Sequence, residues 1–443
     1  MATERPRRPV VLLAYHYPPD AEVGGLRATK VAGALRAAGH EVTVIRASPT
    51  PAEPTRDEAG SRIVTVVPGA SPRELYARLR ERVSSARTSG STEQPAAAET
   101  WQPPRELAPW RRWLFSLFWL PDDKQGFIWR GAQAAIEELR RYGPDALLYS
   151  TSPPHSTHVA GLIAHLSTRA PWVVEFRDPW TGNPGKPWYS RSAATDAIEW
   201  LVERQCLRSA SLVVGVSEGI CEMLVNGRAQ LPPSRAVLVR NGIDGLAEPA
   251  PARGGGPLRI LHAGTCYLGR DPRPFLRAFA SIVKRRGLGP DDVRVELVGR
   301  CDEFAGASIR GVAAELGIGP MVEFTRWLPH QQAAERTRSA DVLLLLAERQ
   351  PLQVPNKVYE YLGARRRILA FADRDGETAR MLNAVGGHTV TQAAAGDVEQ
   401  QVEAAIFGNG HVKPNEDQLS AWTTDRQMAL LVDAIGRVGR LPR

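Results

Sequence analysis

The chain has 443 residues, too many for one ordinary hydrophobic core, so its length predicts two domains. Hydrophobic residues make up 43% and charged residues 23% of the composition, which is typical of a globular protein, and no run of about 18 uncharged apolar residues is present to span a membrane. The net charge of +8 favours an anionic partner such as nucleotide phosphates, lipid head groups or nucleic acid, although an arginine-rich proteome would give the same excess.

The cysteines and the N-terminal segment carry no sign of a secreted or metal-binding protein. The four cysteines, Cys206, Cys221, Cys266 and Cys301, are scattered and form no C-x-x-C pair, so we expect neither a metal site nor a disulfide framework. Only the short apolar stretch 10–15 follows the charged N-terminal segment, which is too short for the apolar part of a signal peptide. These features predict a protein of the reducing cytoplasm.

The first half of the chain alternates between strand and helix patterns. Residues 10–15 predict a buried strand, followed by a turn at Gly24 and Gly25, a helix over roughly 26–38 and a second strand over 41–46, which together form a βαβ unit. The Ser-, Thr- and Pro-rich residues 84–104 predict a mobile loop. Further strands are expected at 63–67, 146–150, 172–176, 212–216 and 236–239. Further helices are expected at 155–166, 193–208 and 218–224.

A second alternating set follows a Pro- and Gly-rich linker at residues 247–257. Because nearly continuous apolar runs indicate strands buried on both faces, both halves are predicted to be parallel, Rossmann-like α/β domains, spanning 1–246 and 258–418, with a ligand site in the cleft between them. A helical pattern within 419–443 is expected to return to the first domain. The strands expected in the second domain are 258–262, 293–298, 322–325, 342–346 and 368–372.

The most informative segment is residues 354–363, where an apolar run ends and a short helix begins after Asn356. Lys357, Glu360 and Tyr361 stand at i, i+3 and i+4, so they share one face near the start of this helix. A helix start carries free N–H groups and partial positive charge, which suit a phosphate, and a carboxylate one turn further on can accept hydrogen bonds from a ribose diol. The segment therefore predicts part of a nucleoside diphosphate site.

A second candidate for phosphate contact follows the predicted strand 258–262. The strand runs into Gly264 and Thr265, and then into Arg270 and Arg273 before a helix led by proline. Backbone N–H groups of such a turn can cradle a phosphate, and either arginine can pair with it through two hydrogen bonds. The alternative is a tight turn with solvated arginines. Neither a G-x-G-x-x-G nor a Walker loop is present at this position.

Polar residues also follow strands of the first half. Gly24 and Gly25 allow close approach of a ligand to the backbone, although turn formation alone would explain them. His155 stands at the expected start of a helix, where it can contact an oxyanion or a sugar hydroxyl, or serve a structural role. Arg177 and Asp178 follow the strand 172–176 and are expected either to pair with each other or to reach an acceptor.

An aromatic segment at 110–121 is flanked by arginines and is a candidate for contact with a membrane interface. The alternative, which we favour, is a core or lid helix whose aromatic side chains pack inward. The aromatic residues concerned are Trp110, Trp113, Phe115, Phe118 and Trp119.

With these segments in this order, the chain resembles the retaining, nucleotide-sugar glycosyltransferases of the GT-B fold, in the family 4 group (glycosyl transferase group 1). The resemblance extends over nearly the whole chain and rests on the order and spacing of several short segments. They are Tyr-Pro-Pro at 17–19, Gly24-Gly25, Gly-His-Glu-Val-Thr-Val at 39–44, Val-Ser-Glu at 216–218, Arg-Asn-Gly-Ile-Asp at 240–244 and the segment 354–363.

The resemblance implies that the C-terminal domain binds the donor nucleotide and the N-terminal domain the acceptor. Glu360 matches the glutamate that holds the ribose, Arg270 is the nearest match to the basic residues that bind the diphosphate, and Lys357 assists it. Gly24-Gly25 would lie near the diphosphate, and His155 is the nearest match to the family's histidine beside the donor sugar.

The chain departs from the family pattern beside this site. Many members carry a second glutamate eight positions before the one that matches Glu360, but Leu352 stands there, and Glu348 lies further upstream. The basic pair that is usual in the diphosphate loop is replaced by Gly264-Thr265 and Arg270. The identity of the transferred sugar therefore does not carry over from the family.

The expected activity is transfer of a glycosyl group from a nucleotide diphosphate sugar to a hydroxyl acceptor, with retention of configuration and without a cofactor or metal. The acceptor would be a polysaccharide, a glycolipid or a secondary metabolite, and the protein would work in the cytoplasm, with the inner face of the membrane as a further candidate location. The alternatives are a sugar-nucleotide epimerase or glycosyl phosphorylase on the same fold, and a non-catalytic scaffold that binds nucleotide sugars. Nucleic acid is not expected as a partner, because the basic residues are dispersed.

Overall fold

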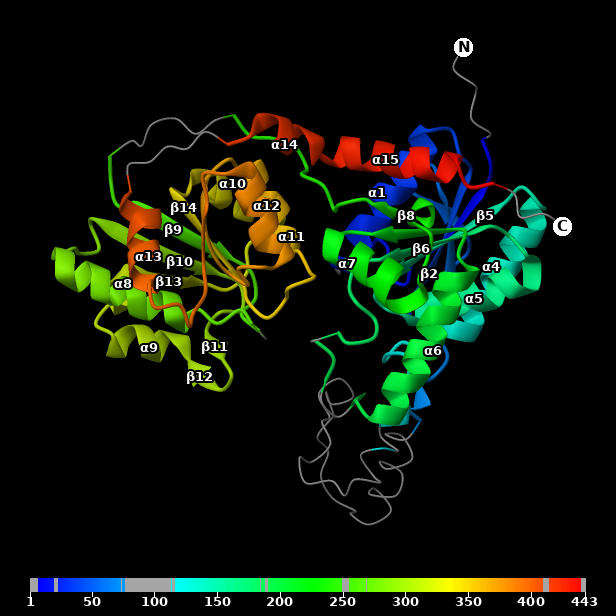
Figure 1. The fold of residues 1–443 in the computed structure, drawn as a ribbon, viewed down its shortest axis with the longest axis horizontal. Coiled ribbons are helices and arrows are strands. Elements are labelled where there is room, and N and C mark those ends of the chain that lie inside the picture. The colour runs from blue at the N-terminus through cyan, green and yellow to red at the C-terminus, as the bar shows by residue number, and fades with distance from the viewer. Residues whose placement is uncertain are drawn as a thin grey trace. The chain divides into compact units, whose positions relative to one another are not determined.

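A computed structural model describes residues 7–19, 23–72, 74–75, 113, 116–183, 185–187, 190–248, 255–267, 269–408 and 414–439. The chain forms two compact units, one made of Met1–Val239 with Met428–Arg443 and the other of Arg240–Gln427. Each unit contains a largely parallel sheet with helices packed on it, which is the two-domain α/β architecture that the sequence predicts (Figure 1). The division falls at Arg240, a few residues before the expected boundary at 246. The predicted loop at 84–104 and linker residues 249–254 lie outside the described residues.

The N-terminal unit is built on one eight-stranded sheet. β1 lies inside the sheet and pairs in parallel with β2 and β5, with Val10 opposite both Val42 and Leu147. The short β3, which the sequence did not reveal, pairs antiparallel with β4. In sheet order the strands are β3 (Thr55–Arg56), β4 (Arg62–Val66), β2 (Val42–Ala47), β1 (Val10–Leu13), β5 (Leu147–Ser152), β6 (Trp172–Phe176), β7 (Leu212–Gly215) and β8 (Ala236–Leu238).

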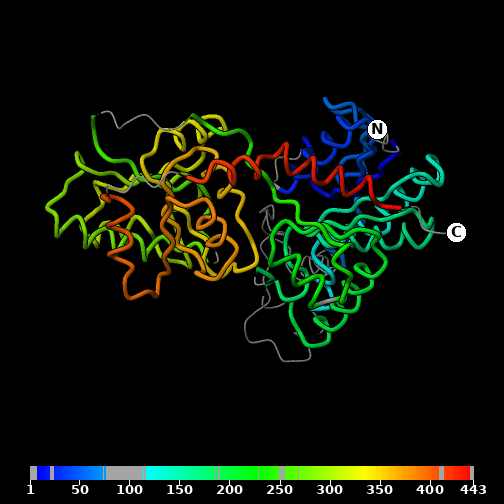
Figure 2. The backbone as a smooth tube through the Cα atoms, turned by 45° about the horizontal axis from the view of Figure 1, so that its top comes forward, coloured from blue at the N-terminus to red at the C-terminus, as the bar shows by residue number. Residues whose placement is uncertain are grey.

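Helices cover this sheet because its strands are apolar on both faces. One buried cluster joins side chains of β1, β2 and β5 to α1 and to the C-terminal helix α15, which lies beside α1 in both views (Figures 1 and 2). The Arg8 guanidinium secures the end of α15 by donating to the carbonyl oxygens of Ile435 and Val438, at 3.1 and 2.8 Å. The helices are α1 (Val23–Ala37), α4 (Phe127–Tyr142), α5 (Ser156–Thr168), α6 (Ala193–Ser209), α7 (Glu218–Glu222), which continues as a π-helical turn (Met223–Ala229), and α15 (Thr424–Gly436).

The C-terminal unit is built on a six-stranded parallel sheet. In sheet order its strands are β13 (Val322–Thr325), β10 (Val293–Val298), β9 (Leu258–Ala263), β14 (Val342–Ala347), β15 (Arg367–Ala372) and β16 (Thr389–Thr391). A separate hairpin pairs β11 (Glu303–Phe304) with β12 (Ala307–Ser308). The helices are α8 (Arg273–Arg286), α9 (Ile309–Glu315), α10 (His330–Ser339), α11 (Asn356–Gly363), α12 (Glu377–Val385), α13 (Val398–Phe407) and α14 (Glu416–Ala421).

The period of two along each strand separates two cores on the faces of this sheet. On β14, Leu344 and Leu346 join the cluster beneath α8, α9 and α13, whereas Leu343 and Leu345 join the cluster beneath α11, α12 and α14. Figure 1 shows the two sets of helices on opposite sides of the strands. Both faces of the central strands are therefore buried, as their uninterrupted apolar runs predict.

The C-terminal helix predicted within 419–443 is wrong in one respect, because the structure interrupts it between α14 and α15. The backbone at this point pairs with another segment instead of continuing the helix. Ile243 donates its N–H to the Trp422 carbonyl oxygen at 2.8 Å, and Thr424 donates to the Ile243 carbonyl oxygen at 3.0 Å. Gly242 has φ +85°, and a Cβ there would lie 2.6 Å from the Cα of Thr424. The Asn241-Gly242 sequence therefore serves this junction.

Candidate functional site

The candidate site of the C-terminal unit lies where the order of its sheet reverses. From β9 the chain proceeds to β10 and β13 on one side and to β14, β15 and β16 on the other. Ligands of open α/β sheets bind outside the carboxyl ends of the strands at such a point. The loop after β9 carries Gly264 to Pro272, and the loop after β14 leads to α11. A Cβ on Gly269 would lie 1.7 Å from the Glu348 carbonyl oxygen, so the loops after β9 and β14 touch.

The loop after β9 is held close to the loop after β10 by backbone contacts. Gly264 donates its N–H to the Val298 carbonyl oxygen at 2.8 Å, and Cys266 donates to that of Arg300 at 3.0 Å. Gly299 has φ +112°, and a Cβ at this position would lie 2.1 Å from the Gly264 carbonyl oxygen. Only glycine fits there, so the half-buried Gly264 and Thr265 are placed by a neighbouring loop that the sequence analysis did not single out.

The start of α11 presents the polar side chains that the sequence predicted. Pro355 precedes the helix and has no side-chain group that can cap its first N–H groups. Lys357 Nζ lies 2.6 Å from one carboxylate oxygen of Glu360, and the Asn356 amide donates to the other at 3.3 Å. The Lys357 and Glu360 side chains are 31% and 33% exposed, so the pair lies at the surface and contributes at most about 1 kcal/mol. A ligand can therefore replace this contact at little cost.

Tyr361 has a different place from the residues around it. It is fully buried, and its hydroxyl oxygen accepts a hydrogen bond from the Ala263 N–H at 2.8 Å. Burial, the largest cause, raises the pKa of this phenol above its ordinary value. Its hydroxyl therefore fixes α11 against the end of β9, and with it the distance between the two loops of the site.

The two arginines of the loop after β9 differ in their partners. Arg273 is paired through three side-chain hydrogen bonds with Asp271, at 2.7 to 3.0 Å, and lies over the Phe304 ring. The Arg270 guanidinium lies 4.6 Å from the Tyr267 ring centre, and its buried Nε has no hydrogen-bond partner among the described residues. Arg270 is therefore the better placed of the two to take an anionic ligand, because a ligand need not displace a carboxylate from it.

Glu348, the acidic residue upstream of Leu352, does not take the place of the family's missing glutamate. Leu352 is half-buried, and Glu348 accepts a hydrogen bond from the Ala393 N–H at 2.8 Å. Burial raises the pKa of Glu348. This carboxylate thus already supports the segment after β16.

In the N-terminal unit, the sheet order reverses between β1 and β5, and the predicted residues again lie at the carboxyl ends of these strands. The expected turn at Gly24 and Gly25 is wrong, because both glycines lie in the first turn of α1, which begins at Val23. The Arg177 guanidinium donates to the carbonyl oxygens of Gly24, Ser152 and Pro153 at 2.8, 2.9 and 2.6 Å. Arg177 therefore ties the segments after β1 and β5 together.

A buried ion pair lies beneath this arginine. Arg27 and Glu175 are 4% and 0% exposed and meet at 2.8 Å, and the Thr151 hydroxyl donates to the same carboxylate at 2.7 Å. Burial alone would raise the pKa of Glu175, but Arg27 and Thr151 hold it below its ordinary value. The charge on Arg27 is thus neutralised inside the unit, and its function is structural.

His155 lies after the carboxyl end of β5 and just before α5. Its ring stacks on Trp180 with a centroid distance of 5.0 Å and an interplanar angle of 2°. Burial, followed by the charges of Lys186 and Arg177, lowers its pKa to about 3, so the imidazole is neutral near pH 7. Its buried Nδ1 has no hydrogen-bond partner within the described part of the chain. His155 can therefore accept a hydrogen bond from a ligand hydroxyl, but it is not a source of a proton.

Two neighbouring residues have structural functions. His158 is fully buried and its Nδ1 lies 2.9 Å from the Ser150 hydroxyl. Asp122 accepts hydrogen bonds from both the backbone N–H and the hydroxyl of Ser156, at 2.8 and 2.6 Å. Asp122 thus caps the start of α5, the helix that follows His155, a contact that the sequence spacing did not reveal.

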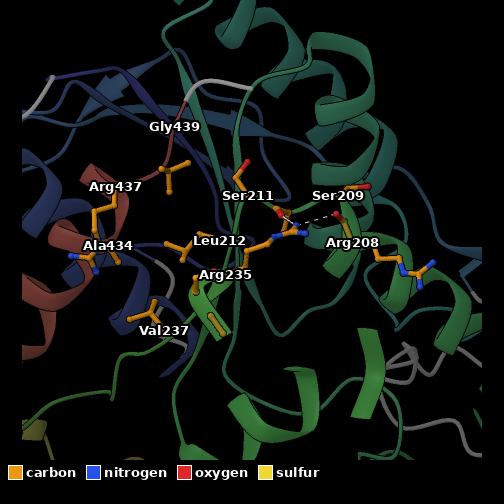
Figure 3. A pocket seen from close by; sticks show the side chains of 13 residues that line it. Arg208, Ser209, Ser211, Leu212, Arg235, Val237, Ala434, Arg437 and Gly439 are labelled. Carbon is orange, nitrogen blue, oxygen red and sulfur yellow. Dashed lines mark hydrogen bonds between the residues drawn. The ribbon is translucent and has the colours of Figure 1, made fainter. Parts of the chain in front are cut away.

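A cavity of about 480 Å³ lies at the amino ends of β7 and β8 (Figure 3), whereas the predicted residues lie at the carboxyl ends of strands in the same sheet. Arg208, Arg235 and Arg437 contribute to its lining. The Arg235 guanidinium is engaged with the carbonyl oxygens of Arg208 and Ala210. The cavity is thus remote from the strand ends that carry the predicted residues.

The aromatic segment is only partly described. Trp113 is 45% exposed, and Phe118 and Trp119 are half-buried. Trp110 and Phe115 lie outside the described residues. None of the helices in the described ranges is long and apolar enough to cross a membrane. Membrane contact through this segment stays a prediction.

Comparisons with solved structures show the class of protein. Sucrose-phosphate synthase from Thermosynechococcus elongatus is 14% identical with a TM-score of 0.58, over 97% of this chain and 94% of that chain. A UDP-forming α,α-trehalose-phosphate synthase from Burkholderia vietnamiensis is 10% identical with a TM-score of 0.58, over 97% and 98%. Anabaena HepE in complex with UDP is 14% identical with a TM-score of 0.53, over 97% and 96%. The chain thus has the fold of the GT-B glycosyltransferases.

A known family model matches the sequence of the N-terminal half. Residues 24–242 match the model of the glycosyl transferase 4-like domain, whereas a search of curated proteins found no match. The chain is a glycosyltransferase of the GT-B type, and its residues 24–242 match a glycosyl transferase 4-like domain.

Proposed function

We propose that the protein transfers a glycosyl group from a nucleoside diphosphate sugar to a hydroxyl acceptor, with retention of configuration. The observation that carries this proposal is the arrangement in the C-terminal unit. The start of α11 with the Lys357–Glu360 pair follows the loop after β14, and Arg270 lies in the loop after β9, with no hydrogen-bond partner for its Nε in the described ranges. These two loops meet at the reversal of the sheet. The fold of Anabaena HepE, solved with UDP and with UDP-glucose, supports a donor of this class.

Each part of the donor has a matching group at this site. The Glu360 carboxylate can exchange its contacts with Asn356 and Lys357 for the two hydroxyls of a ribose. Lys357 and Arg270 then supply positive charge for the diphosphate, and the first N–H groups of α11 add hydrogen-bond donors. Gly264 and Thr265 let the diphosphate approach the backbone. This set of groups distinguishes a nucleoside diphosphate from a simple sugar phosphate.

The chemistry follows from the charge that develops on the leaving group. As the bond between the anomeric carbon and the diphosphate oxygen breaks, negative charge grows on that oxygen, and Arg270, Lys357 and the helix start stabilise it. The acceptor oxygen forms its bond to the anomeric carbon from the same face, and its proton passes to the departing diphosphate oxygen. No separate carboxylate base and no divalent cation are needed in this scheme.

His155 fits a role in binding a sugar. Because its ring is neutral near pH 7 and stacks on Trp180, its Nδ1 can accept a hydrogen bond from a sugar hydroxyl. Leu352 leaves one polar contact of the family absent, so sugar specificity in this protein depends on other groups. The acceptor class that we propose is the hydroxyl of a growing polysaccharide, a glycolipid or a secondary metabolite.

The proposal is tested by a thermal-shift screen of nucleoside diphosphates and their sugars. A ligand that binds only the folded state at a hundred times its Kd adds about 2.7 kcal/mol of stability, which raises Tm measurably. The best donor is then incubated with acceptor mixtures, and the anomeric configuration of the product is read by NMR. We expect retention, and turnover that added Mg²⁺ or Mn²⁺ does not raise. A protein that no nucleoside diphosphate stabilises would contradict the proposal.

A further inference from the structure

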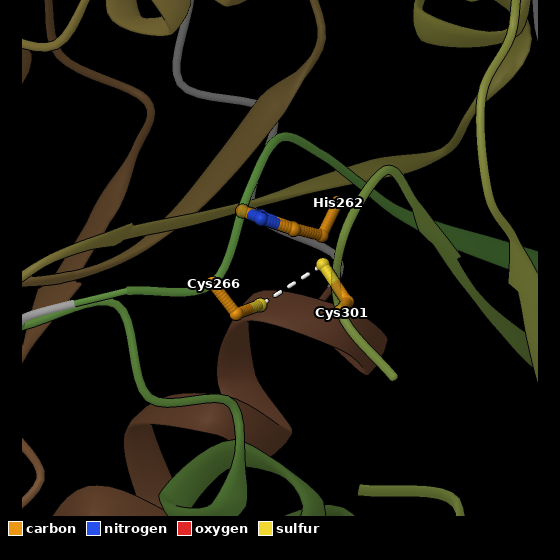
Figure 4. Close-up of side chains that lie close together, drawn as sticks. All are labelled: His262, Cys266 and Cys301. Carbon is orange, nitrogen blue, oxygen red and sulfur yellow. Dashed lines mark hydrogen bonds between the residues drawn. The ribbon is translucent and has the colours of Figure 1, made fainter. Parts of the chain in front are cut away.

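Three side chains capable of binding a metal ion come together beside the candidate site. His262 is the penultimate residue of β9, Cys266 lies in the loop after β9, and Cys301 lies in the loop after β10 (Figure 4). One ligand atom from each residue lies within 4.8 Å of the others. The three residues are 4%, 7% and 1% exposed, so the cluster is shielded from solvent.

The orientation of His262 indicates what the cluster can bind. Its Nδ1 lies 2.9 Å from the Leu344 carbonyl oxygen, and since a carbonyl only accepts, Nδ1 carries the proton. Nε2 is therefore a lone-pair donor, and it is buried without a hydrogen-bond partner among the described residues. Metal-binding histidines commonly have their other ring nitrogen fixed to a carbonyl in this way. A Cβ built on Gly264 would lie 3.2 Å from Nε2, so this atom lies against the start of the loop that carries Cys266.

The sulfur atoms lie 2.9 Å apart, which leaves two kinds of cross-link to compare. A disulfide bond needs about 2.05 Å. Two thiolates on one tetrahedral Zn²⁺, each about 2.3 Å from the ion, lie about 3.8 Å apart. Either product requires a sulfur movement of about 0.9 Å. Distance does not decide between them, but the histidine does, because a disulfide would leave Nε2 buried and unpaired.

We propose that His262 Nε2, Cys266 Sγ and Cys301 Sγ bind one Zn²⁺ ion. Two thiolates and one imidazole are a donor set that favours zinc over Mg²⁺ or Ca²⁺. Each thiol releases its proton to solvent as its sulfur binds the ion. An oxygen ligand completes the tetrahedron, and the nearby Gly264 carbonyl oxygen, 3.4 Å from Cys301 Sγ, is one such group.

The function of this ion would be to join two loops. Cys266 and Cys301 lie 35 residues apart, yet their loops follow neighbouring strands and already share backbone hydrogen bonds. The ion would hold the loop of Gly264 and Thr265 in place from beneath, without touching the donor. Because the proposed zinc site is structural, the inference does not depend on the proposed transfer reaction, which needs no divalent cation.

The experiment is a metal analysis of the full chain, produced in zinc-supplemented medium and purified without a metal-affinity tag. Plasma mass spectrometry is expected to find close to one zinc per chain in the native protein. Growth with Co²⁺ is expected to give the absorption of a cobalt–thiolate centre, a readout that needs no substitution. Less than a tenth of an equivalent of zinc, or another metal in its place, would overturn the assignment.

Substitutions locate the ion. Cys301→Ser and Cys266→Ser are expected to lower the zinc content at least tenfold, whereas Cys221→Ser, in the N-terminal unit, is expected to leave it unchanged. Equal zinc in all variants would overturn the proposal, as would a Cys266–Cys301 disulfide detected by mass spectrometry of peptides from the native protein. Nucleoside diphosphate binding is measured in parallel, so a protein that binds zinc but no nucleotide would contradict only the proposed function.

Discussion

Glu360→Ala is the substitution whose effect follows most directly from the site. In the free protein the carboxylate is one third exposed and contacts Lys357 and Asn356. Two charge-assisted hydrogen bonds to a ribose diol contribute about 1.5–3 kcal/mol each, and about 1 kcal/mol is lost when the surface contact with Lys357 is displaced. Allowing for solvent exposure, the substitution is expected to weaken nucleoside diphosphate binding by about 2–4 kcal/mol, or roughly 30- to 1000-fold.

Isothermal titration calorimetry with the best nucleoside diphosphate measures this loss. A ligand without the ribose 2′- and 3′-hydroxyls provides the second arm of a double-mutant cycle. It is expected to bind the native protein more weakly, and to bind Glu360→Ala no worse than the full nucleotide does. Glu335→Ala, at an exposed position on α10 of the same unit, is the matched control and is expected to bind as the native protein does. Unchanged affinity in a folded Glu360→Ala protein would refute the assignment.

Three further results are expected. Arg270→Ala should lower kcat about 100- to 1000-fold, the scale of losing one oxyanion donor, while Arg273→Ala should lower it less than tenfold; equal losses would show that the two arginines act alike. Because the pKa of His155 is about 3 in the folded protein and about 6.5 when unfolded, its contribution to stability is fully present above pH 6.5 and is lost as pH falls toward 3. The unfolding free energy from urea titrations should thus fall with decreasing pH less steeply in His155→Phe, by up to about 1.4 kcal/mol per pH unit, and identical slopes would contradict the buried neutral state. Gly299→Ala should destabilise the protein by about 1–3 kcal/mol more than Gly306→Ala, because both glycines have positive φ but only Gly299 meets the Gly264 carbonyl oxygen, and equal thermal stability would contradict this.

The sequence predicted the strands well because parallel strands buried on both faces read as unbroken apolar runs. The expected ranges 172–176, 293–298 and 322–325 coincide with β6, β10 and β13. The short β3 carries no such run, since both of its residues are exposed, and it could not be found in this way. The interruption before α15 was missed for another reason: it is imposed by the distant Ile243 backbone and not by a local helix breaker.

The site was predictable where its residues share one local segment. Lys357 and Glu360 stand on one helix turn, so their spacing alone placed them together, whereas Tyr361, which was predicted on the same face, is buried against the end of β9. The cluster of His262, Cys266 and Cys301 was missed because it depends on two neighbouring strands that end at the same edge of the sheet. The sequence does contain the needed signal, since both cysteines lie within four residues of the end of a predicted strand, but a search limited to C-x-x-C spacing does not detect it.

Hydrogen–deuterium exchange with saturating nucleoside diphosphate tests most directly the central claim that the C-terminal unit binds the donor. Exchange is expected to slow in peptides that cover the loop after β9, residues 264–272, and α11, Asn356–Gly363. Peptides from the cavity at the start of β7 and β8 are expected to exchange as in the free protein. Protection confined to the N-terminal unit, with a nucleotide that demonstrably binds, would contradict the account.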